Sequence, residues 1–385
     1  MNRCSVEVVK HEVIITRAGF LSSVQDLGRT GFREFGVSLS GALDPFGMRV
    51  ANLFVGNDEG AAGLEITFGG VQLQFQDERI VAWCGGEFNV QIGSQPLPAG
   101  HVALLQAGGE LKFGGAQIGC RCWLAISGGL DVPMILGSRS TDLRANFGGF
   151  GGRALRDGDV IPLGPRPGSS DFAKATADNP IPATRISSWT ASHDWVSPAK
   201  REPILRFVRG MDWTPFNAST LQRVTSEPFT VSPDSDRMGV RLTGPELPRG
   251  DNVAEPAKAG QPLQQKSSNS RSDADRRGWA TQPVEATGCP PGAKRVDLIS
   301  EAVVPGTLQV PPSGQPILLL GDCQTIGGYP KIAHVITVDL GVAAQVRAGD
   351  RLRFSEVSLG DAHQMLLQRE RSLERFRIGL SLREP

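Results

Sequence analysis

Short apolar runs alternate with glycine-rich turns along the first part of the chain. The runs are Leu64–Phe68, Val71–Phe75, Ile80–Cys84, Phe88–Ile92, His101–Leu105, Glu110–Phe113 and Cys120–Ser127. Their spacing of about ten residues, with turn signals between them, is typical of a β-sandwich or barrel. With an alternating pattern over residues 6–16 and a final strand ending at Leu163, they predict a first β domain over residues 1–164.

A second β domain is predicted over residues 204–358. Its expected strands are Ile204–Val208, Phe229–Ser232, Val240–Leu242, Pro316–Leu320, Val335–Val338 and Arg351–Phe354, with a further strand signal by Ala302. The stretch between the domains, residues 165–203, is rich in Pro, Ser and Ala, which predicts a linker or extended crossing. Inside the second domain, residues 251–283 are too polar to form a core, so we expect a dispensable, disordered insertion there.

Two segments show a helical pattern instead. Asp44 is a good N-cap and Pro45 suits the first helical position, which predicts a helix that ends near Leu53. Residues 359–385 are expected to form a C-terminal helix and tail, because apolar residues between Met365 and Phe376 gather on one side of a charged segment. The predicted fold class is therefore mainly β, with two β domains, a few short helices and a C-terminal helix.

A weak internal repeat supports two similar domains. The pattern Gly36-Val-x-Leu-x-Gly41 returns as Gly239-Val-x-Leu-x-Gly244, and Arg156-x-Gly-Asp-x-Ile161 returns as Arg347-x-Gly-Asp-x-Leu352. Each pattern alone is common, but the two occur in the same order in both halves.

Composition narrows the class of protein. Hydrophobic residues make up 39% of the 385-residue chain, which is enough for a packed core. The formal net charge is zero, so the sequence carries no electrostatic signature of a nucleic-acid or membrane partner. The N-terminal residues lack the apolar segment of a signal peptide, and six cysteines do not form a disulfide framework. A cytoplasmic protein is expected.

Polar side chains of several kinds gather on one loop that follows the strand Pro316–Leu320. They are Asp322, Gln324, Thr325, Tyr329 and Lys331. Gly327-Gly328 frees the backbone between them for a positive φ or for close approach to a ligand. Loops that combine such groups at a strand end are where polar ligand sites are usually built.

Other polar groups could complete this site. They are Gln25, Asp26 and Arg29 on an N-terminal loop, Asp236, Arg237 and Arg241 on a later segment, and Gln345. Cationic and amide side chains suit a carboxylate, carbamate or acyl-phosphate ligand, and a desolvated aspartate could act as a general base. The alternative for each arginine is an exposed ion pair of little energy.

Several other kinds of site are not indicated. The chain has no P-loop motif, and its histidines lack metal-ligand spacing, so no metal site is predicted. Cys323 has no assignable histidine partner and is expected to be a buried small residue rather than a nucleophile. Cys120 and Cys122 are expected to pack in the core, and His334 to be packed or on the surface.

The motifs together resemble one protein family. They are Ser23-Val-Gln-Asp-Leu-Gly-Arg29, Gly41-Ala-Leu-Asp44, Ala51-Asn-x-x-Val-Gly-Asn57, Leu64-Glu65, Ser235-Asp-Arg-Met-Gly-Val-Arg-Leu242, Gly306-x-x-Gln-Val-Pro311, Gly314-Gln-Pro316 and Asp322-x-Gln-Thr-x-Gly-Gly-Tyr-Pro-Lys331. Over residues 13–357 the chain is similar to the allophanate hydrolase subunit 2 family, also called the biotin-dependent carboxyltransferase family. This family includes the C subunit of 5-oxoprolinase, the Kip-antagonist protein and part of urea carboxylase.

The resemblance implies cyclophilin-like β-barrel domains and a shared activity. In the 5-oxoprolinase form, the C subunit acts with the B subunit, which is a subunit 1 homologue, and with the A subunit to open 5-oxoproline to glutamate with ATP. ATP is thus an implied ligand, which a partner could bind, since no nucleotide motif is visible in this chain. On this interpretation Asp322, Gln324, Lys331 and Arg237 are expected to be catalytic. The residues expected to bind substrate are Gln25, Asp26, Arg29, Arg241, Thr325, Tyr329 and Gln345.

Two alternatives stay open at the level of sequence. One is the carboxyltransferase subunit of a biotin-dependent, urea-type carboxylase, which would use carboxybiotin. The other is a regulatory binding protein of the Kip-antagonist type, which binds a subunit 1 (Kip inhibitor-like) partner.

Overall fold

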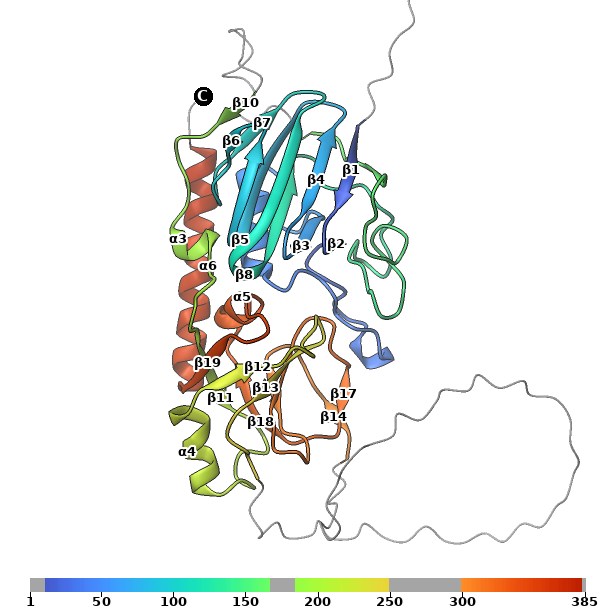
Figure 1. The fold of residues 1–385 in the computed structure, drawn as a ribbon. Coiled ribbons are helices and arrows are strands. Elements are labelled where there is room, and N and C mark those ends of the chain that lie inside the picture. Colours follow the sequence, from blue (N-terminus) through green and yellow to red (C-terminus); the bar gives the residue numbers. More distant parts are fainter. Residues whose placement is uncertain (1–10, 167–183, 249–298, 383–385) are drawn as a thin grey trace, which may run out of the picture.

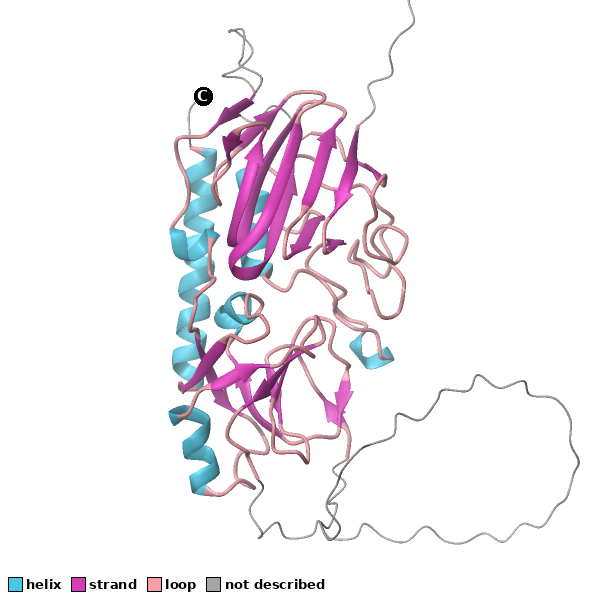
Figure 2. Cartoon of the chain, in the orientation of Figure 1, coloured by secondary structure: helices cyan, strands magenta, loops and turns pink. Residues whose placement is uncertain are grey.

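The computed structural model describes residues 11–166, 184–248 and 299–382 and contains two β domains (Figure 1). A long C-terminal helix, α6 (Leu359–Ser381), runs along one side of both domains. The predicted insertion at 251–283 lies outside the described residues. Strands far outnumber helices (Figure 2), so the prediction of a mainly β fold is confirmed. No helix in the described ranges is long and apolar enough to cross a membrane.

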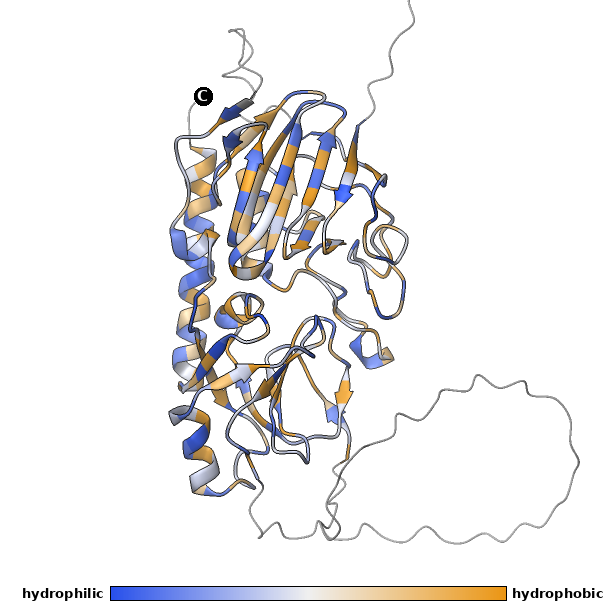
Figure 3. Cartoon of the chain, in the orientation of Figure 1, coloured by the Kyte–Doolittle hydropathy of each residue, from blue (hydrophilic) through white to orange (hydrophobic). Residues whose placement is uncertain are grey.

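The first domain is built on a ten-stranded antiparallel sheet. Its strands are β1 (Glu12–Ala18), β2 (Leu21–Gln25), β3 (Gly63–Thr67), β4 (Val71–Phe75), β5 (Arg79–Ile92), β6 (Gln95–Pro96), β7 (Ala103–Leu105), β8 (Glu110–Ile126), β9 (Val160–Pro162) and β10 (Thr184–Ile186). The main path runs β10-β7-β5-β8-β4-β1-β9, and β3, which pairs with β2, attaches to β8. Apolar and polar residues alternate along β4 (Figure 3), as expected for strands with one buried face.

Two long strands replace four predicted short ones. β5 joins Ile80–Cys84 to Phe88–Ile92, and β8 joins Glu110–Phe113 to Cys120–Ser127. The pairing register shifts between Gly85 and Glu87, so the glycines there mark a bulge rather than the end of a strand. The predicted strand ends were wrong because glycine is common both in β-bulges and in the turns that end strands.

The segment predicted as a crossing carries more structure than a linker. β10 pairs antiparallel with β7, and α3 (His193–Val196) packs against β5 and α1 (Pro45–Phe54). Trp195 lies edge-on to Phe46, with ring centroids 5.4 Å apart. This segment therefore covers α1 and extends the first sheet.

The second domain is a closed barrel. Its strands, in order around the barrel, are β11 (Ile204–Arg209), β18 (Lys331–Val335), β15 (Thr307–Gln309), β16 (Ile317–Leu319), β13 (Gly239–Thr243), β12 (Phe229–Val231) and β19 (Arg351–Glu356). A small ribbon of β14 (Glu301–Ala302) and β17 (Ile326–Gly327) lies beside it. The short helical elements of the second domain are α4 (Ala218–Ser226), α5 (Leu340–Ala343) and the 3-10 turn η2 (Thr337–Asp339). A further 3-10 turn, η1 (Arg33–Phe35), lies between β2 and α1 of the first domain.

The predicted strand at Val335–Val338 is wrong. The strand ends at Val335, and the chain turns into η2, where the backbone N–H of Asp339 donates to Ile336 O at 2.9 Å. The Asp339 carboxylate then binds the backbone and guanidinium of Arg206, which holds the turn on the barrel.

Both predicted helices are present. Asp44 caps α1 by accepting from the backbone N–H of Gly47 at 3.0 Å, and Pro45 is its first residue. In α6, Leu373 is buried and Phe376 packs edge-on against Phe54 of α1 at 5.3 Å. The amphipathic pattern of the C-terminal segment therefore predicted its contact face.

Candidate functional site

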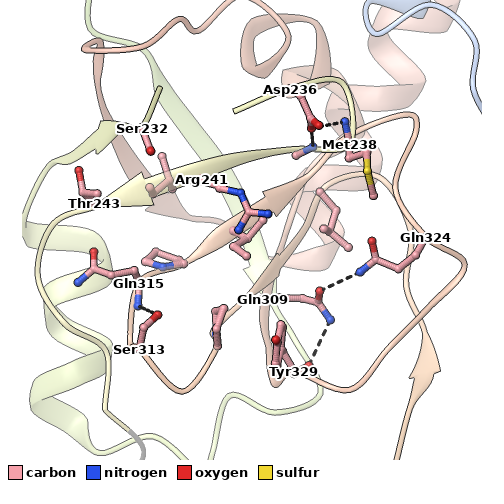
Figure 4. Close-up of a pocket in the computed structure, with 16 residues that line it drawn as sticks. Ser232, Asp236, Met238, Arg241, Thr243, Gln309, Ser313, Gln315, Gln324 and Tyr329 are labelled. Carbon is pink, nitrogen blue, oxygen red and sulfur yellow. Dashed lines mark hydrogen bonds between the residues drawn. The ribbon is translucent and has the colours of Figure 1, made fainter. Parts of the chain in front are cut away.

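A polar pocket of about 410 Å³ opens on the wall of the second-domain barrel (Figure 4). Strands β13, β15 and β16 and the loop between β16 and β18 form its walls. The polar side chains that line it are those of Ser232, Asp236, Arg241, Thr243, Gln309, Ser313, Gln315, Gln324 and Tyr329. A cavity of this size with several convergent polar groups fits a small ligand.

Arg241 is the cation of this pocket. Its guanidinium reaches into the pocket (Figure 4) and has no hydrogen-bond or ion-pair partner among the described residues. The carboxylate of Asp236 is engaged by backbone instead, since it accepts from the N–H groups of Met238 (2.8 Å) and Gly239 (3.2 Å). Arg241 is therefore available for an anionic group of a ligand.

Gln309 connects the groups on the opposite wall. It is buried, its Oε1 accepts from Gln324 Nε2 at 3.4 Å, and its Nε2 donates to Tyr329 O at 3.3 Å. A Cβ on Gly327 would lie 2.5 Å from Gln309 Nε2, so a glycine is needed for this approach. Gln309 was not among the predicted site residues, although it lies inside one of the quoted motifs.

A buried ion cluster lies where the two domains meet. Arg237 binds Asp322 through Nε–Oδ2 (2.8 Å) and Nη2–Oδ1 (3.1 Å), and it also pairs with Glu65 of the first domain. Its Nη2 donates to Gly41 O at 2.8 Å. Burial raises the pKa of Asp322, with Glu65 and Asp142 adding to the shift while Arg237 opposes it. One arginine thus balances two carboxylates, and its contacts with Glu65 and Gly41 join the second domain to the first.

Lys331 and Thr325 lie outside the pocket. The ammonium of Lys331 is buried, with Glu301 Oε2 at 2.9 Å and Asp212 Oδ2 at 3.6 Å. Thr325 contributes its backbone carbonyl, which accepts from the N–H of Val303 at 3.0 Å. Lys331 of β18 thus holds the β14–β17 ribbon against the barrel, and Thr325 extends the pairing within the ribbon.

Asp26 and Arg29 fasten a loop of the first domain. The Asp26 carboxylate accepts from the hydroxyls of Ser138 (2.6 Å) and Ser140 (2.5 Å). Arg29 donates to Ser140 O and lies over the ring of Phe147 at 4.4 Å. Burial lowers the pKa of Arg29.

Two glutamines that were predicted to bind substrate are buried in contacts with backbone. Gln25 Nε2 donates to Thr141 O at 3.2 Å. Gln345 Oε1 accepts from the N–H groups of Cys120 (3.2 Å) and Arg121 (3.1 Å), and so connects the second domain to β8 of the first. Neither side chain lines the pocket.

Cys323 and His334 are buried to different degrees. Cys323 is fully buried, and burial raises the pKa of its thiol although Arg33 opposes the shift, as expected for a packed residue. His334 is half-buried, with Nδ1 3.2 Å from Thr307 Oγ1. Burial and then the charge of Lys331 lower its pKa.

The structure therefore divides the predicted site residues into separate groups. Asp236, Arg241, Gln324 and Tyr329 share the pocket, and Arg237 and Asp322 form an ion pair at the domain boundary. The other predicted residues lie outside the pocket and make contacts that stabilise the fold. The sequence predicted one polar site, whereas the structure places only some of its residues in the pocket.

Comparison with known proteins gives consistent results over most of the chain. The family model "Carboxyltransferase domain, subdomain A and B" matches residues 35–356. The C subunit of the Haemophilus influenzae 5-oxoprolinase is 33% identical over 356 residues, which cover 92% of this chain and 94% of that protein. The protein of the same name from Escherichia coli is 32% identical over 362 residues and is covered to 96%.

One solved structure shows the same fold inside a larger protein. The crystal structure of the K. lactis urea amidolyase aligns with a TM-score of 0.75 and 25% identity over 97% of this chain. The alignment spans only 20% of that longer chain.

Proposed function

The chain belongs to the carboxyltransferase domain family, subdomains A and B, and from this membership we propose that it is the C subunit of a 5-oxoprolinase. It acts with the A and B subunits to open 5-oxoproline to glutamate with hydrolysis of ATP. One observation carries the proposal. The two relatives of that name match over 94% and 96% of their own length, whereas the K. lactis urea amidolyase matches over 20% of its chain.

The barrel pocket offers the groups that this substrate needs. 5-Oxoproline is a small ring that carries a carboxylate and a cyclic amide. The free guanidinium of Arg241 would bind the carboxylate, and the carboxamide of Gln324 would bind the cyclic amide. Gln309 holds Gln324 and the backbone of Tyr329 in place, so the pocket is organised before a ligand enters.

The same pocket does not fit ATP. A triphosphate needs several cationic or backbone N–H donors, and Arg241 is the only Lys or Arg among the described residues that line the pocket. Asp236 would add a negative charge beside the phosphates. We therefore assign ATP binding to a partner protein and expect hydrolase activity only in the assembled enzyme.

The expected partners are homologues of the A and B subunits. A cytoplasmic location stays a prediction of the sequence, and the cyclophilin-like class of the two β domains stays what the family resemblance implies.

A second function is favoured by the likeness to the urea amidolyase structure. In that case the chain would transfer a carboxyl group, and carboxybiotin would supply that group when bound. Arg241 and Gln324 could hold a carboxylated ring in the same way.

Reconstitution distinguishes these functions. Purified chain is mixed with its candidate A and B partners, and ATP hydrolysis is measured with and without 5-oxoproline. We expect hydrolysis that depends on 5-oxoproline and on this chain. Complex formation without stimulation would contradict the proposal and favour a regulatory binding protein, and stimulation by urea and a biotinylated carrier would favour the second function.

A further inference from the structure

A loop of the first domain contacts the loop that lines the barrel pocket. Residues 26–43 connect β2 to α1 and extend from the first domain to the β14–β17 ribbon of the second (Figure 1). We call this loop the arm. Its two ends are held together, since the N–H of Ala42 donates to Asp26 O at 2.9 Å and that of Arg29 donates to Leu39 O at 2.8 Å. The arm is therefore an ordered projection, and it carries η1 between these two ends.

Arg33 is the residue of η1 that reaches the second domain. Its Nη2 donates to Val303 O at 2.5 Å and to Gln324 O at 3.1 Å. The charge of Arg33 also opposes the rise in the pKa of Cys323, the residue before Gln324. Gly36 closes the turn, because its N–H donates to Arg33 O at 3.0 Å with φ of 80°. The guanidinium is thus presented by a fixed turn to the backbone of the pocket loop.

Gln324 is held both at its backbone and at its side chain. The side chain lines the pocket and donates to Gln309 Oε1 at 3.4 Å (Figure 4), while the backbone carbonyl accepts from Arg33. The side-chain bond is long, so it alone restrains the carboxamide weakly. A carbonyl that accepts from a charged donor is the stronger restraint. The position of Gln324 in the pocket therefore depends on a residue of the first domain.

Val303 extends this contact to a second segment of the chain. It is 1% exposed, and its N–H donates to Thr325 O at 3.0 Å. Arg33 thus binds two neighbouring segments at once, the ribbon at Val303 and the pocket loop at Gln324. Loss of the guanidinium would leave both carbonyls without this donor, and a buried carbonyl without a partner is unfavourable. The loop should then move to find another donor.

A second arginine of the first domain contacts the pocket lining more weakly. Nη1 of Arg144 lies 3.2 Å from Sγ of Met238, which is a lining residue. A thioether is a weak acceptor, and Arg144 is exposed, so this contact restrains the pocket little. Of the two arginines, Arg33 is the one that can fix the lining.

We propose that Arg33 is a positioning residue for the barrel pocket and holds the carboxamide of Gln324 where the cyclic amide of the substrate binds. The pocket of the second domain is then complete only when the arm of the first domain lies on it. This inference rests on the proposed 5-oxoproline site and adds to that site a residue that does not line the pocket.

The test uses a single reporter, because the one tyrosine of the chain, Tyr329, lines the pocket. The full chain is labelled with fluorotyrosine, and its fluorine NMR signal is followed during titration with 5-oxoproline. We expect the signal to shift in the wild type, and Arg33→Met to bind about three- to tenfold more weakly. Arg33→Lys keeps a charged donor and should recover part of the affinity, which a merely structural effect of Arg33→Met does not predict.

Arg121→Met is the matched control. Arg121 is a half-buried arginine of the first domain, and its Nη1 donates to Ala344 O of the second domain at 2.5 Å, away from the pocket lining. This variant should bind 5-oxoproline as the wild type does. Equal loss of affinity in Arg121→Met and Arg33→Met would assign the effect to the contact between the domains and would overturn the positioning role. Unaltered affinity in Arg33→Met would also overturn it.

Hydrogen exchange without ligand keeps this inference distinct from the proposed function. In Arg33→Met the backbone N–H groups of residues 323–328 should exchange about fivefold faster or more, with wild-type rates in the first-domain sheet. If 5-oxoproline leaves the wild-type Tyr329 signal unchanged, the substrate assignment of the pocket fails, and exchange alone decides the role of Arg33. Faster exchange confined to this loop would then support the positioning role, and equal exchange in both proteins would overturn it.

Discussion

Arg241 differs from the other arginines of the proposed site in having no partner for its charge among the described residues. Arg237 and Arg29 use their guanidinium groups to hold parts of the fold together. Such a difference is invisible in the sequence, where all three look like equivalent anion-binding groups. It depends on which carboxylates and carbonyls the fold brings within reach.

Replacement of Arg241 should affect substrate binding and leave folding intact. In the reconstituted enzyme, Arg241→Gln should raise KM for 5-oxoproline about 10- to 100-fold, as expected for the loss of a charged hydrogen bond. Steady-state kinetics measure this change. Arg156→Gln, at an exposed position of the first domain, is the matched control and should behave as the wild type. An unchanged KM in Arg241→Gln would show that the carboxylate of 5-oxoproline does not bind to Arg241 in this pocket.

Gln309 positions Gln324 and the backbone of Tyr329, so its replacement should leave both residues less well fixed in the pocket wall. We expect Gln309→Leu to reduce kcat/KM about tenfold through both bonds that it makes. Gln315→Leu is a suitable comparison, because Gln315 lines the same pocket but bonds only to the backbone of Gly244. If both variants lose the same activity, Gln309 has no special positioning role.

His334 should make stability depend on pH near neutrality. Its folded pKa lies below the ordinary value of 6.5, so the unfolded chain binds this proton more readily. The stability that neutral His334 contributes is present above that value and is lost as the pH falls below it. Thermal melts between about pH 7.5 and pH 5.5 should therefore show a smaller decrease for His334→Gln than for the wild type. Parallel curves would contradict this assignment.

At the scale of elements, half of the predicted repeat corresponds to a shared structure. The Arg-x-Gly-Asp turns before β9 and β19 are alike: the N–H of Arg156 donates to Asp159 Oδ2, and that of Arg347 donates to Asp350 Oδ2. Gly158 has the same φ of 87° as Gly349. The other half of the repeat is wrong, since residues 36–41 form an irregular loop and residues 239–243 form β13.

These two turns allow a clean test of backbone strain. A Cβ on Gly158 or Gly349 would have no atom within 4 Å, so alanine at either position would be strained only by its positive φ. Each substitution should lower the free energy of unfolding by about 1–2 kcal/mol, and the two values should be similar. Gly115→Ala, also in open space but without a positive φ, should change stability little. Denaturant unfolding measures all three, and a cost at Gly115 equal to the others would refute the explanation.

Element types were predictable from the sequence, and some element limits were not. Hydrophobic periodicity found most strands and both long helices, because it depends only on neighbours along the chain. It could not distinguish a glycine bulge from a turn in β5 and β8, since that choice is made by the partner strand. The pocket was predicted in part. Arg241, Gln324 and Tyr329 were among the predicted residues, whereas Gln309, which comes from strand β15, was missed.

At the scale of the whole molecule, the contact between the domains could not be predicted. Arg237 and Glu65 are 172 residues apart in sequence, and no local pattern indicates that they pair. Removal of this arginine tests its importance for the interface. Arg237→Met should destabilise the protein by about 3–5 kcal/mol, because Glu65 and Asp322 would be left buried without a counter-charge.

Calorimetry tests whether Arg237→Met loses stability at the contact between the two domains. We expect one thermal transition for the wild type and two transitions, one for each domain, for Arg237→Met. The exposed Arg241→Met is the control and should retain the wild-type melting temperature. A small effect in Arg237→Met would mean that the ion cluster contributes little to the interface.

Helix α6 has a consequence for the order of events during synthesis. It follows both domains in the chain and touches each: Glu370 binds Arg49 of α1 with two contacts of 2.7 Å, and Arg369 donates to Val338 O at 2.6 Å. Both β domains must therefore have left the ribosome before α6 can pack across them. The helix therefore adds its contacts to an interface that Arg237, Glu65 and Gln345 can already form. A nascent chain that stalls before residue 359 would leave the side of α1 that α6 contacts uncovered.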